Sequence, residues 1–403
     1  MVLLVEMRFN NRDKVYTYLE EYSSDIKSQI NKGRTINTLL KSYIFETSTQ
    51  DSKLDIDQIF DIKDYSTNIV DEGMLRLLRG QETVGFVEKI NNRFSVMHSI
   101  DSAQRSDSYT NALLKQTPLL DSLWISGKMF DLFWERIQKE HTPHRYIKMK
   151  FEFNGFFDNR SSKTRSLKDL ENTTEEIYDD ESITSITLVE ELADLGRKIE
   201  GVRSFFSAFY AVGLLRFPSY VGKGGHDFYR NGKVTNRSES FLDHRIQIKR
   251  TIEKYQIITE SIESKTWLNF DVYKDSNEGV KFHGSPVVFK FSRPLKDHVF
   301  INFVNFTFPT GKEPFRILGK PIWINDNKVH IYGTDIHLWQ KVLLDLSKEE
   351  FIAILPRGTC GNTIHRLVTN IQRYLDPEVQ VNIGDQSYEA FMRGTIEGSA
   401  KDE

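Results

Sequence analysis

Apolar residues near the start of the chain recur at the spacing of an amphipathic helix. Successive positions are four or three residues apart and share one helical face: Val15, Leu19, Tyr22, Ile26 and Ile30. The pattern stops before Gly33, and glycine commonly follows the last turn of a helix. The sequence therefore predicts an N-terminal helix.

Helix and strand patterns then alternate. The segments "SYTNALLKQ" (108–116) and "KMFDLFWERIQKE" (128–140) have helical spacing, and Pro118 separates them. In "HRYIKMKFEF" (144–153) apolar and polar residues alternate, which is the pattern of a half-buried strand. We expect residues 1–156 to form a mixed α/β domain.

Residues 157–186 contain few large apolar side chains and many charges. Such a composition buries little apolar surface. We interpret this stretch as a polar linker or an exposed insertion.

Two long apolar tracks follow, one on each side of a glycine-rich stretch. The first has helical spacing and ends near Leu215: Leu188, Leu192, Leu195, Ile199, Val202, Phe206 and Phe209. The second continues to about Ser264: Phe241, Ile248, Ile252, Tyr255 and Ile258. Two helices around one connection favour an antiparallel pair. We therefore predict a long antiparallel helical hairpin over residues 187–265.

Strand patterns dominate the first part of residues 266–403. They occur in "SPVVFKFS", "HVFINFVNFTF", "KPIWIN" and "KVHIYG", separated by Pro, Gly or Asn/Asp turns. The last two read as a β-hairpin with Asp326 and Asn327 at its tip. An antiparallel sheet is expected here.

Three helices are predicted to close this C-terminal domain. Thr334 is a candidate cap for "DIHLWQKVLLDL", and Ser347 with Glu350 matches a capping box. The third, "NTIHRLVTNIQRYL" (362–375), has the clearest apolar stripe, opposite a polar face. The predicted fold class of the whole chain is α+β.

Composition narrows the class of protein. The 403 residues are 39% hydrophobic, and 54 Lys and Arg nearly balance 57 Asp and Glu. A net charge of −3 gives no global attraction to nucleic acid or acidic membrane, so any polyanion site must be local. The opening "MVLLVEM" lacks the features of a secretory signal, and no apolar stretch is long enough to cross a bilayer. A single cysteine, Cys360, suits a reducing compartment. We expect a cytoplasmic protein without membrane contact.

The stretch "GKGGHDFYRNGK" (222–233) is the first candidate site. Five cations and two carboxylates lie between Arg216 and Glu239, interleaved with aromatic residues. Cations pair with phosphates, aromatic faces stack on bases, and glycines let backbone N–H groups approach an anion. The spacing matches neither a P-loop nor a dinucleotide fingerprint, so the alternative is a mobile loop tip between helices. The candidate anion-binding residues are Lys223, Gly224, Gly225, His226, Tyr229, Arg230 and Lys233.

A second candidate site is "RGTCGNTIHR" (357–366), where a two-glycine turn leads into the predicted C-terminal helix. Exposed N–H groups and the helix dipole favour an anion at such a start. The alternative is a solvated helix face with an ordinary N-cap. The candidate residues are Arg357, Asn362, His365 and Arg366.

These sites favour a cytoplasmic binding protein that contacts DNA, RNA or another phosphate-rich partner as a component of a larger assembly. One alternative is a thiol-dependent hydrolase or transferase, with Cys360 as nucleophile and His365 as base. Another is a structural module that docks a protein partner through the helical hairpin. The sequence predicts no cofactor and no metal site, because His141 and His144 have no carboxylate at ligand spacing.

Overall fold

The chain folds into two compact units, and each unit contains two separate stretches of the sequence. The computed structural model describes residues 9–32, 38–47, 59–158, 183–273 and 279–399. Unit 1 consists of Met1–Leu123 and Arg216–Thr251, and unit 2 consists of Trp124–Leu215 and Ile252–Glu403. The sequence predicts linear boundaries after residues 156, 186 and 265. In the structure the chain passes between units after Leu123, Leu215 and Thr251.

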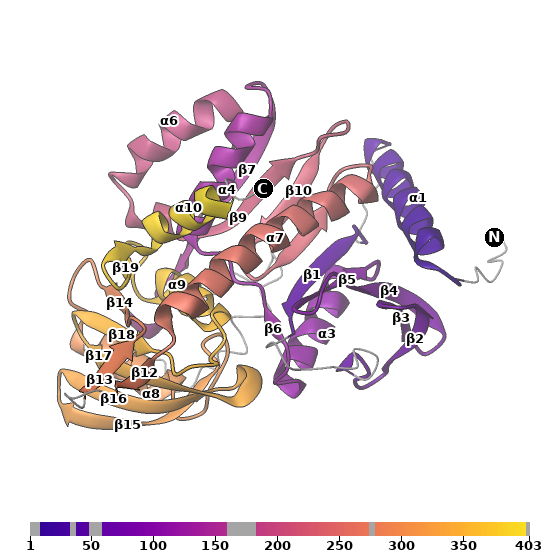
Figure 1. Ribbon diagram of the computed structural model, residues 1–403. Coiled ribbons are helices and arrows are strands. Elements are labelled where there is room, and N and C mark those ends of the chain that lie inside the picture. The colour runs from indigo at the N-terminus through magenta and orange to yellow at the C-terminus, as the bar shows by residue number, and fades with distance from the viewer. Residues whose placement is uncertain (1–8, 33–37, 48–58, 159–182, 274–278, 400–403) are drawn as a thin grey trace. The chain divides into compact units, whose positions relative to one another are not determined.

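Unit 1 is built on an antiparallel sheet (Figure 1) with the strand order β2-β3-β4-β5-β1-β11-β10. The strands are β1 (Lys41–Glu46), β2 (Tyr65–Asp71), β3 (Met74–Arg79), β4 (Glu82–Lys89), β5 (Phe94–Ser99), β10 (Gly225–Tyr229) and β11 (Lys233–Asn236). A two-residue strand, β6 (Asp121–Ser122), also pairs with β1.

Helices cover both faces of this sheet. They are α1 (Arg12–Asn31), α3 (Ala103–Gln116) and the first part of α7 (Phe241–Thr266). One core cluster joins α3 to the strand residues Tyr43 and Phe45, and a second joins α1 to Phe86 and Phe241. The predicted N-terminal helix is confirmed as α1, because its apolar stripe is buried in the second cluster.

Unit 2 contains two groups of antiparallel strands. In the first, β7 (Tyr146–Asn154) pairs with β8 (Ile183–Glu191) and with the start of β9 (Val212–Pro218). The second has the order β15-β16-β17-β18-β14-β19-β20. Its strands are β14 (Val287–Lys290), β15 (Ile317–Asn325), β16 (Lys328–Asp335), β17 (Gln340–Ser347), β18 (Glu350–Ile354), β19 (Gln380–Ile383) and β20 (Gln386–Ser387).

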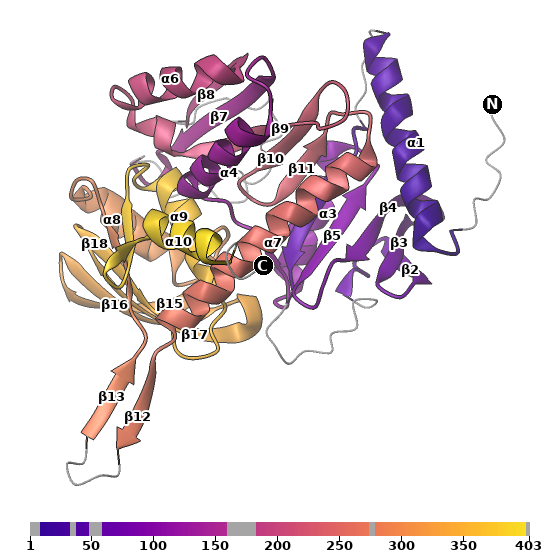
Figure 2. The same cartoon turned by 45° about the horizontal axis from the view of Figure 1, so that its top comes forward.

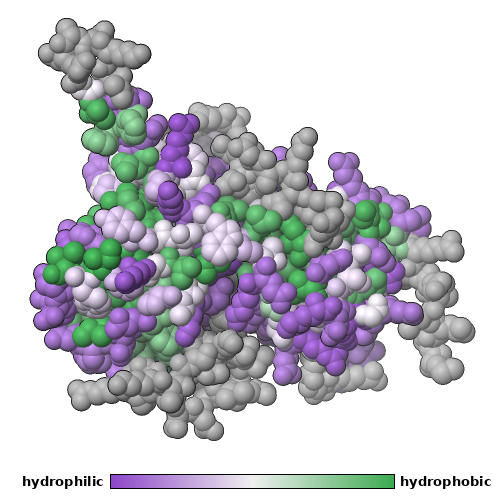
Figure 3. All heavy atoms as spheres, turned by 90° about the horizontal axis from the view of Figure 1, so that it is seen from below, coloured by the Kyte–Doolittle hydropathy of each residue, from purple (hydrophilic) through white to green (hydrophobic). Residues whose placement is uncertain are grey.

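The remaining strands of unit 2 form a separate hairpin of β12 (Asn269–Tyr273) and β13 (Gly279–His283). The hairpin projects from the rest of its unit (Figure 2), and apolar residues gather along it, as Figure 3 shows in green. Phe270 and Phe282 face each other across the two strands and are 59% and 70% exposed.

The helices of unit 2 are α4 (Gly127–Glu140), α6 (Leu192–Arg203), α8 (Asp297–Thr307), α9 (Asn362–Tyr374), α10 (Tyr388–Ser399) and the second part of α7, with short 3-10 turns at Phe156–Asp158, Ser207–Tyr210 and His337–Trp339. The predicted helix at 128–140, strand at 144–153 and hairpin around Asp326 are confirmed as α4, β7 and β15–β16. In the parts of the chain that the structure describes, no helix combines the length and the apolar character needed to span a bilayer.

The α+β class is confirmed, but the predicted helical hairpin over residues 187–265 is absent. Only its second helix exists, as α7. The first predicted helix starts within β8, continues as α6 to Arg203, and is followed by a 3-10 turn and β9. The apolar run of β9 is buried because it lies in a sheet. Phe205, just after α6, is 82% exposed. The predicted linker falls mostly on residues 159–182, which lie outside the described residues.

Three predictions for the C-terminal part are wrong. "HVFINFVNFTF" forms α8, since its buried residues have helical spacing: Val299, Phe300, Phe303, Val304 and Thr307. "DIHLWQKVLLDL" contributes β17, in which buried and half-buried positions alternate. Ser347 does not start a helix. Its hydroxyl accepts from the backbone N–H groups of Glu349 and Glu350 in the tight turn between β17 and β18.

Candidate functional site

The glycine-rich stretch forms a tight turn in unit 1 between the end of β9 at Pro218 and the start of β10 at Gly225. Gly222 and Gly224 have φ angles of +81° and +92°, a region that residues with a Cβ rarely adopt. A Cβ on Gly224 would lie 2.3 Å from the carbonyl oxygen of Arg237 and 3.3 Å from Nζ of Lys27. Glycine is therefore required here by both conformation and space.

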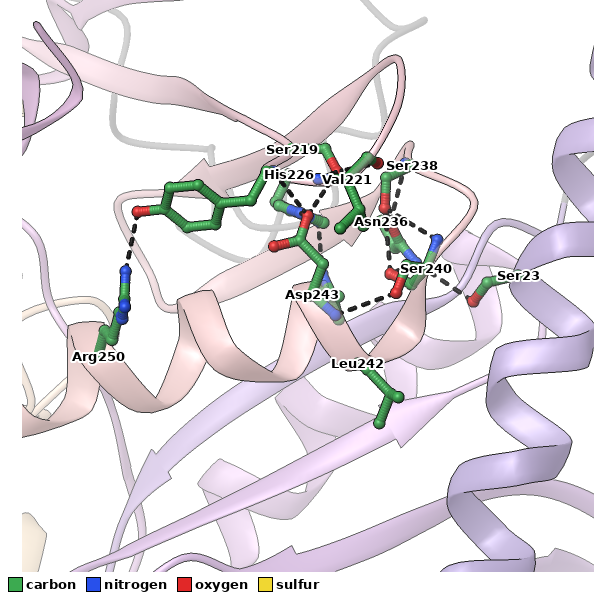
Figure 4. Close-up of polar contacts among 12 residues, drawn as sticks. Ser23, Ser219, Val221, His226, Asn236, Ser238, Ser240, Leu242, Asp243 and Arg250 are labelled. Atoms are coloured by element: carbon green, nitrogen blue, oxygen red, sulfur yellow. Dashed lines mark hydrogen bonds and ion pairs between the residues drawn. The ribbon is translucent and has the colours of Figure 1, made fainter. Parts of the chain in front are cut away.

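A buried carboxylate on α7 accepts hydrogen bonds from this turn. Asp243 lies in the first turn of α7, and its Oδ2 accepts hydrogen bonds from Ser219 Oγ (2.5 Å), the Tyr220 backbone N–H (3.1 Å) and His226 Nε2 (3.0 Å), as Figure 4 shows. Burial opposes the ionisation of Asp243, but the hydrogen bonds from His226 and Ser219 outweigh it and lower the pKa. A charged carboxylate thus ties two successive residues of the turn to α7.

A second polar layer fixes the segment that leads into α7. Asn236 Nδ2 donates to Ser23 Oγ and to the Ser240 carbonyl, both at 3.2 Å, and Asn236 Oδ1 accepts from Ser238. Ser240 Oγ in turn accepts from the backbone N–H of Asp243 at 3.1 Å (Figure 4). These bonds hold Asp243 in place at the start of the helix.

Two arginines beside the turn share one buried carboxylate. Asp227 is fully buried and accepts from Arg216 Nε (2.6 Å) and Nη2 (3.0 Å) and from Arg237 Nε (2.5 Å). Both arginine side chains remain partly exposed, at 23% and 35%. The pKa of Asp227 is lowered because these bonds and charges outweigh its burial. Asp227 therefore orients two guanidinium groups at the surface.

Two lysines complete this positive region. Lys27, from α1, donates to the carbonyl of Arg237 at 3.0 Å, and Lys223 is exposed at the tip of the turn. Burial lowers the pKa of Lys27, Glu239 opposes the shift, and the charges of Arg216 and Arg237 add to it. We call Lys27, Arg216, Lys223 and Arg237 the basic cluster. Its four cations face two carboxylates, Asp227 and Glu239, which leaves a local positive surplus.

An aromatic side chain, Tyr220, belongs to the same turn as Lys223. Tyr220 is 39% exposed. The exposed side chain of Arg250, on α7, donates to the Tyr220 hydroxyl at 3.0 Å, and its guanidinium carbon lies 5.3 Å from the ring centroid. The pair presents flat, partly exposed surfaces of the kind on which nucleobases stack.

The other predicted residues of this stretch have structural surroundings. Gly225 begins β10, and His226 is fully buried against Asp243. Lys233 donates to both carboxylate oxygens of Asp107 at 2.8 Å, and its ammonium lies 5.6 Å from the ring centroid of Tyr229. Arg230 is half-buried in the turn between β10 and β11. The predicted twelve-residue loop is thus a turn followed by a β-hairpin, and Lys223 and Gly224 lie in the turn itself.

The second predicted site lies in unit 2, where α9 begins. Arg357 is exposed, but Asn362, His365 and Arg366 are fully buried. Asn362 Oδ1 accepts from the hydroxyl of Tyr255. His365 Nε2 lies 3.1 Å from Thr259 Oγ1, and His365 Nδ1 lies 2.6 Å from the Tyr388 hydroxyl.

The remaining polar groups at this helix start also bond internally. Arg366 donates to Asp335 and to the carbonyl of Phe315, and Glu263 accepts from the backbone N–H of Gly361 at 2.8 Å. The alternative of a solvated helix face is therefore wrong, and Asn362, His365 and Arg366, predicted to bind an anion, are buried. The polar side of α9 is an interior layer in which His365, Arg366 and Thr369 bond to other protein groups.

The thiol of the predicted alternative enzyme is also in the interior. Cys360 is 1% exposed, and its Sγ accepts from the Asn362 backbone N–H at 3.4 Å. A buried thiol of this kind behaves as a small apolar residue.

The sequence patterns did not identify two residues that contact the turn and its surroundings, Lys27 and Asp243. Lys27 is 210 residues from Arg237 in the chain, and Asp243 lies in a helix that begins well after the turn, so no local pattern connects them. The sequence shows Arg216 and Arg237 as local charges, but their arrangement around Asp227 depends on strand pairing.

Comparisons with known proteins extend over nearly the whole chain. The sequence profile of a family described as "MJECL33-like protein" matches residues 5–390. Over 402 residues the chain is 24% identical to the uncharacterized protein MJECL33 of Methanocaldococcus jannaschii, covering 93% of this chain and 94% of that protein. No solved structure matches the chain. The chemistry of the site therefore has to be argued from its geometry.

Proposed function

The chain belongs to the MJECL33-like protein family, and we propose that it binds a phosphate-rich ligand, with single-stranded nucleic acid as the ligand class, at the glycine-rich turn of unit 1. The observation that carries this proposal is the pair of partly exposed arginines that buried Asp227 holds beside Lys27 and Gly224. The fold holds these cations close together although they repel one another, and an anion relieves that repulsion.

The chemistry of the basic cluster suits phosphate. Guanidinium groups present planar donors that match phosphate oxygens, and lysine adds a mobile point charge. The left-handed turn at Gly222 and Gly224 removes side-chain bulk where an anion would approach the backbone. Because the whole chain is slightly acidic, this local surplus has to supply the electrostatic attraction.

The aromatic ring in the turn favours nucleic acid over free phosphate. Tyr220 is held through its backbone N–H by Asp243 and through its hydroxyl by Arg250, so its ring has a fixed place in the turn that carries Lys223. Stacking of a base on such a ring contributes about 1–3 kcal/mol and needs an unpaired base. Backbone phosphates at the cluster with a base on Tyr220 therefore fit a single strand.

The test is salt-dependent binding of a fluorescein-labelled oligothymidylate of about 20 nucleotides, followed by fluorescence polarisation of the full chain. The variant combines Lys27→Ala with Lys223→Ala, which removes two cations and leaves Asp227 with both arginines. Each lost phosphate contact on a single strand reduces the slope of log K against log salt by about 0.7. We expect the double variant to lose about 1.4 from that slope.

Lys14→Ala is the matched control. Lys14 is exposed on the same helix as Lys27, about 20 Å away along its axis, and should leave the slope unchanged. No binding by the parent chain, or the same slope in parent and double variant, would refute the proposal. Equal affinity for a duplex of the same length would contradict the single-strand assignment.

A further inference from the structure

A chain of buried side chains continues from Asp243 into the interior of unit 1. Five contacts link six side chains in sequence: Asp243 Oδ2 to His226 Nε2 (3.0 Å), His226 Nδ1 to His244 Nδ1 (3.1 Å), His244 Nε2 to Ser42 Oγ (2.8 Å), Ser42 Oγ to His98 Nδ1 (2.8 Å) and His98 Nε2 to Glu88 Oε2 (3.4 Å). None of the six residues is more than 5% exposed. We call them the histidine chain.

Strand geometry explains why these residues meet. Ser42 on β1 and His98 on β5 are directly opposite each other in the antiparallel ladder. Their neighbours Tyr43 and Met97 belong to the core cluster of α3. Because successive side chains in a strand point to opposite faces, Ser42 and His98 point to the other face, where His244 on α7 meets Ser42.

Carboxylates end the histidine chain on both sides. Burial opposes the ionisation of Glu88, but hydrogen bonds from His98 and Arg245 outweigh it and lower its pKa. Asp243 has a lowered pKa for the reason given above. Both ends are therefore charged and act only as acceptors.

The number of hydrogens that the five contacts need fixes the charge of the histidine chain. Each of the five contacts needs one hydrogen. The Ser42 hydroxyl supplies one and each neutral imidazole supplies one, which gives four in total. The fifth contact requires one histidine to carry a second proton. Each of the three histidines satisfies the count equally well.

The surroundings indicate where this proton resides. Burial lowers the pKa of His244 well below its ordinary value, and the neighbouring histidines lower it further. Direct contact with a carboxylate stabilises an imidazolium, and the two histidines that have such a contact are His226, beside Asp243, and His98, beside Glu88. Among the described residues, the other charged or titratable groups that act on Glu88 at the end of the histidine chain are Arg245 and Tyr16, which both donate to it, and Arg12, which interacts with it through its charge.

We propose that this single buried proton positions the glycine-rich turn, so that ligand binding at the turn depends on its presence. Without it, one contact of the histidine chain has no hydrogen, and the chain that supports Asp243 is broken. Asp243 in turn holds Ser219 and the Tyr220 N–H. The functional meaning of this inference rests on the proposed function of the turn, but its test needs no ligand.

The experiment uses the full chain labelled with ¹⁵N-histidine, in which two-bond proton–nitrogen spectra report the state of each ring. At neutral pH we expect one imidazolium equivalent within the histidine chain. Ser42→Ala removes two contacts and leaves three, which three neutral histidines satisfy. That variant should contain no imidazolium among His98, His226 and His244. Ser95→Ala is the matched control, because Ser95 is also buried on the sheet and its hydroxyl has no hydrogen-bond partner among the residues that the structure describes.

Amide exchange at Tyr220 reports the position of the turn. When the pH is raised from neutrality until the imidazolium signal disappears from the parent, the protection factor of the Tyr220 N–H should fall by about tenfold, the effect of losing one hydrogen bond. The same protection factor should stay constant in Ser42→Ala over this range. Ser95→Ala should behave like the parent.

Three neutral histidines in the parent at neutral pH would overturn the hydrogen count. A parent whose imidazolium disappears while Tyr220 protection stays constant would overturn the positioning role. His98→Gln repeats the test if Ser42→Ala does not fold, because its amide still donates to Glu88 and the remaining three contacts again need no extra proton. If the oligonucleotide does not bind while the imidazolium count and the Tyr220 protection behave as expected, only the proposed function is refuted.

Discussion

Gly224→Ala is the sharpest test of the turn's geometry. Gly224 has a φ of +92°, and its added Cβ would lie 2.3 Å from the Arg237 carbonyl oxygen. Because that neighbour is backbone, the turn has to shift by about 1 Å to reach ordinary contact. Gly80→Ala is the control, since Gly80 is also exposed in unit 1 with a φ of +62°, but no atom of the described residues lies within 4 Å of its added Cβ.

The expected costs differ by the hydrogen bonds that the shift breaks. A left-handed alanine costs about 1 kcal/mol at either position. At Gly224 the shift also disrupts the bonds from Ser219 N to Gly224 O (3.2 Å) and from Arg237 N to Gly225 O (2.9 Å), each worth about 1 kcal/mol. We expect Gly224→Ala to lower the local opening free energy by about 3 kcal/mol and Gly80→Ala by about 1 kcal/mol at its own site.

Hydrogen exchange with mass spectrometry measures this difference, because peptides that cover residues 219–229 report opening of the turn and of β10. Tryptophan fluorescence would not, since every tryptophan of the chain lies in unit 2. Oligothymidylate affinity should fall more than tenfold in Gly224→Ala and stay unchanged in Gly80→Ala. Equal exchange effects in the two variants, with equal affinities, would refute the geometric argument.

Three further outcomes follow from the buried groups. Arg366→Met leaves the buried Asp335 carboxylate without its charge partner and should lower the stability of unit 2 by about 3–5 kcal/mol, measured by tryptophan fluorescence in urea. Cys360 is buried, so iodoacetamide should label it slowly in the native chain and rapidly in urea, and rapid native labelling would contradict this. The folded-state pKa of Asp243 lies below its ordinary value, so its stabilisation is complete above about pH 4 and is lost as the pH falls through the folded-state pKa. Exchange of residues 219–229 should therefore accelerate in acid, and Asp243→Asn should remove that acceleration.

Elements with one clear period could be predicted from the sequence. The apolar residues of α1 repeat with the period of a helix, and those of β7 alternate with the period of a strand. Each pattern therefore buries one face and fits only one type of element. The run that forms α8 is apolar at almost every position, so it fits both periods, and only its burial pattern distinguishes them. Tertiary packing therefore determines that this segment forms a helix and not a strand.

The site was less accessible to sequence reasoning. The glycines at residues 222–225 indicate a turn, but the structure places this turn between β9 and β10 and not between two helices. Residues in and around the turn bond to Lys27 from α1 and Asp243 from α7, and a sequence pattern does not report such long-range contacts. The polar face of α9 illustrates the opposite error. Its hydrogen-bonding residues read as solvated, but they bond to other buried groups such as Asp335 and Tyr388.

The division of unit 1 between two stretches of chain has a consequence for synthesis on the ribosome. Strand β1 pairs with β11, which is translated only after the whole of residues 124–215. At ordinary elongation rates the early strands wait on the order of ten seconds for this neighbour. During that interval one edge of β1 lacks its β11 partner, and open strand edges recruit other chains. A nascent or truncated chain that ends at Leu123 is thus expected to need a chaperone or to aggregate.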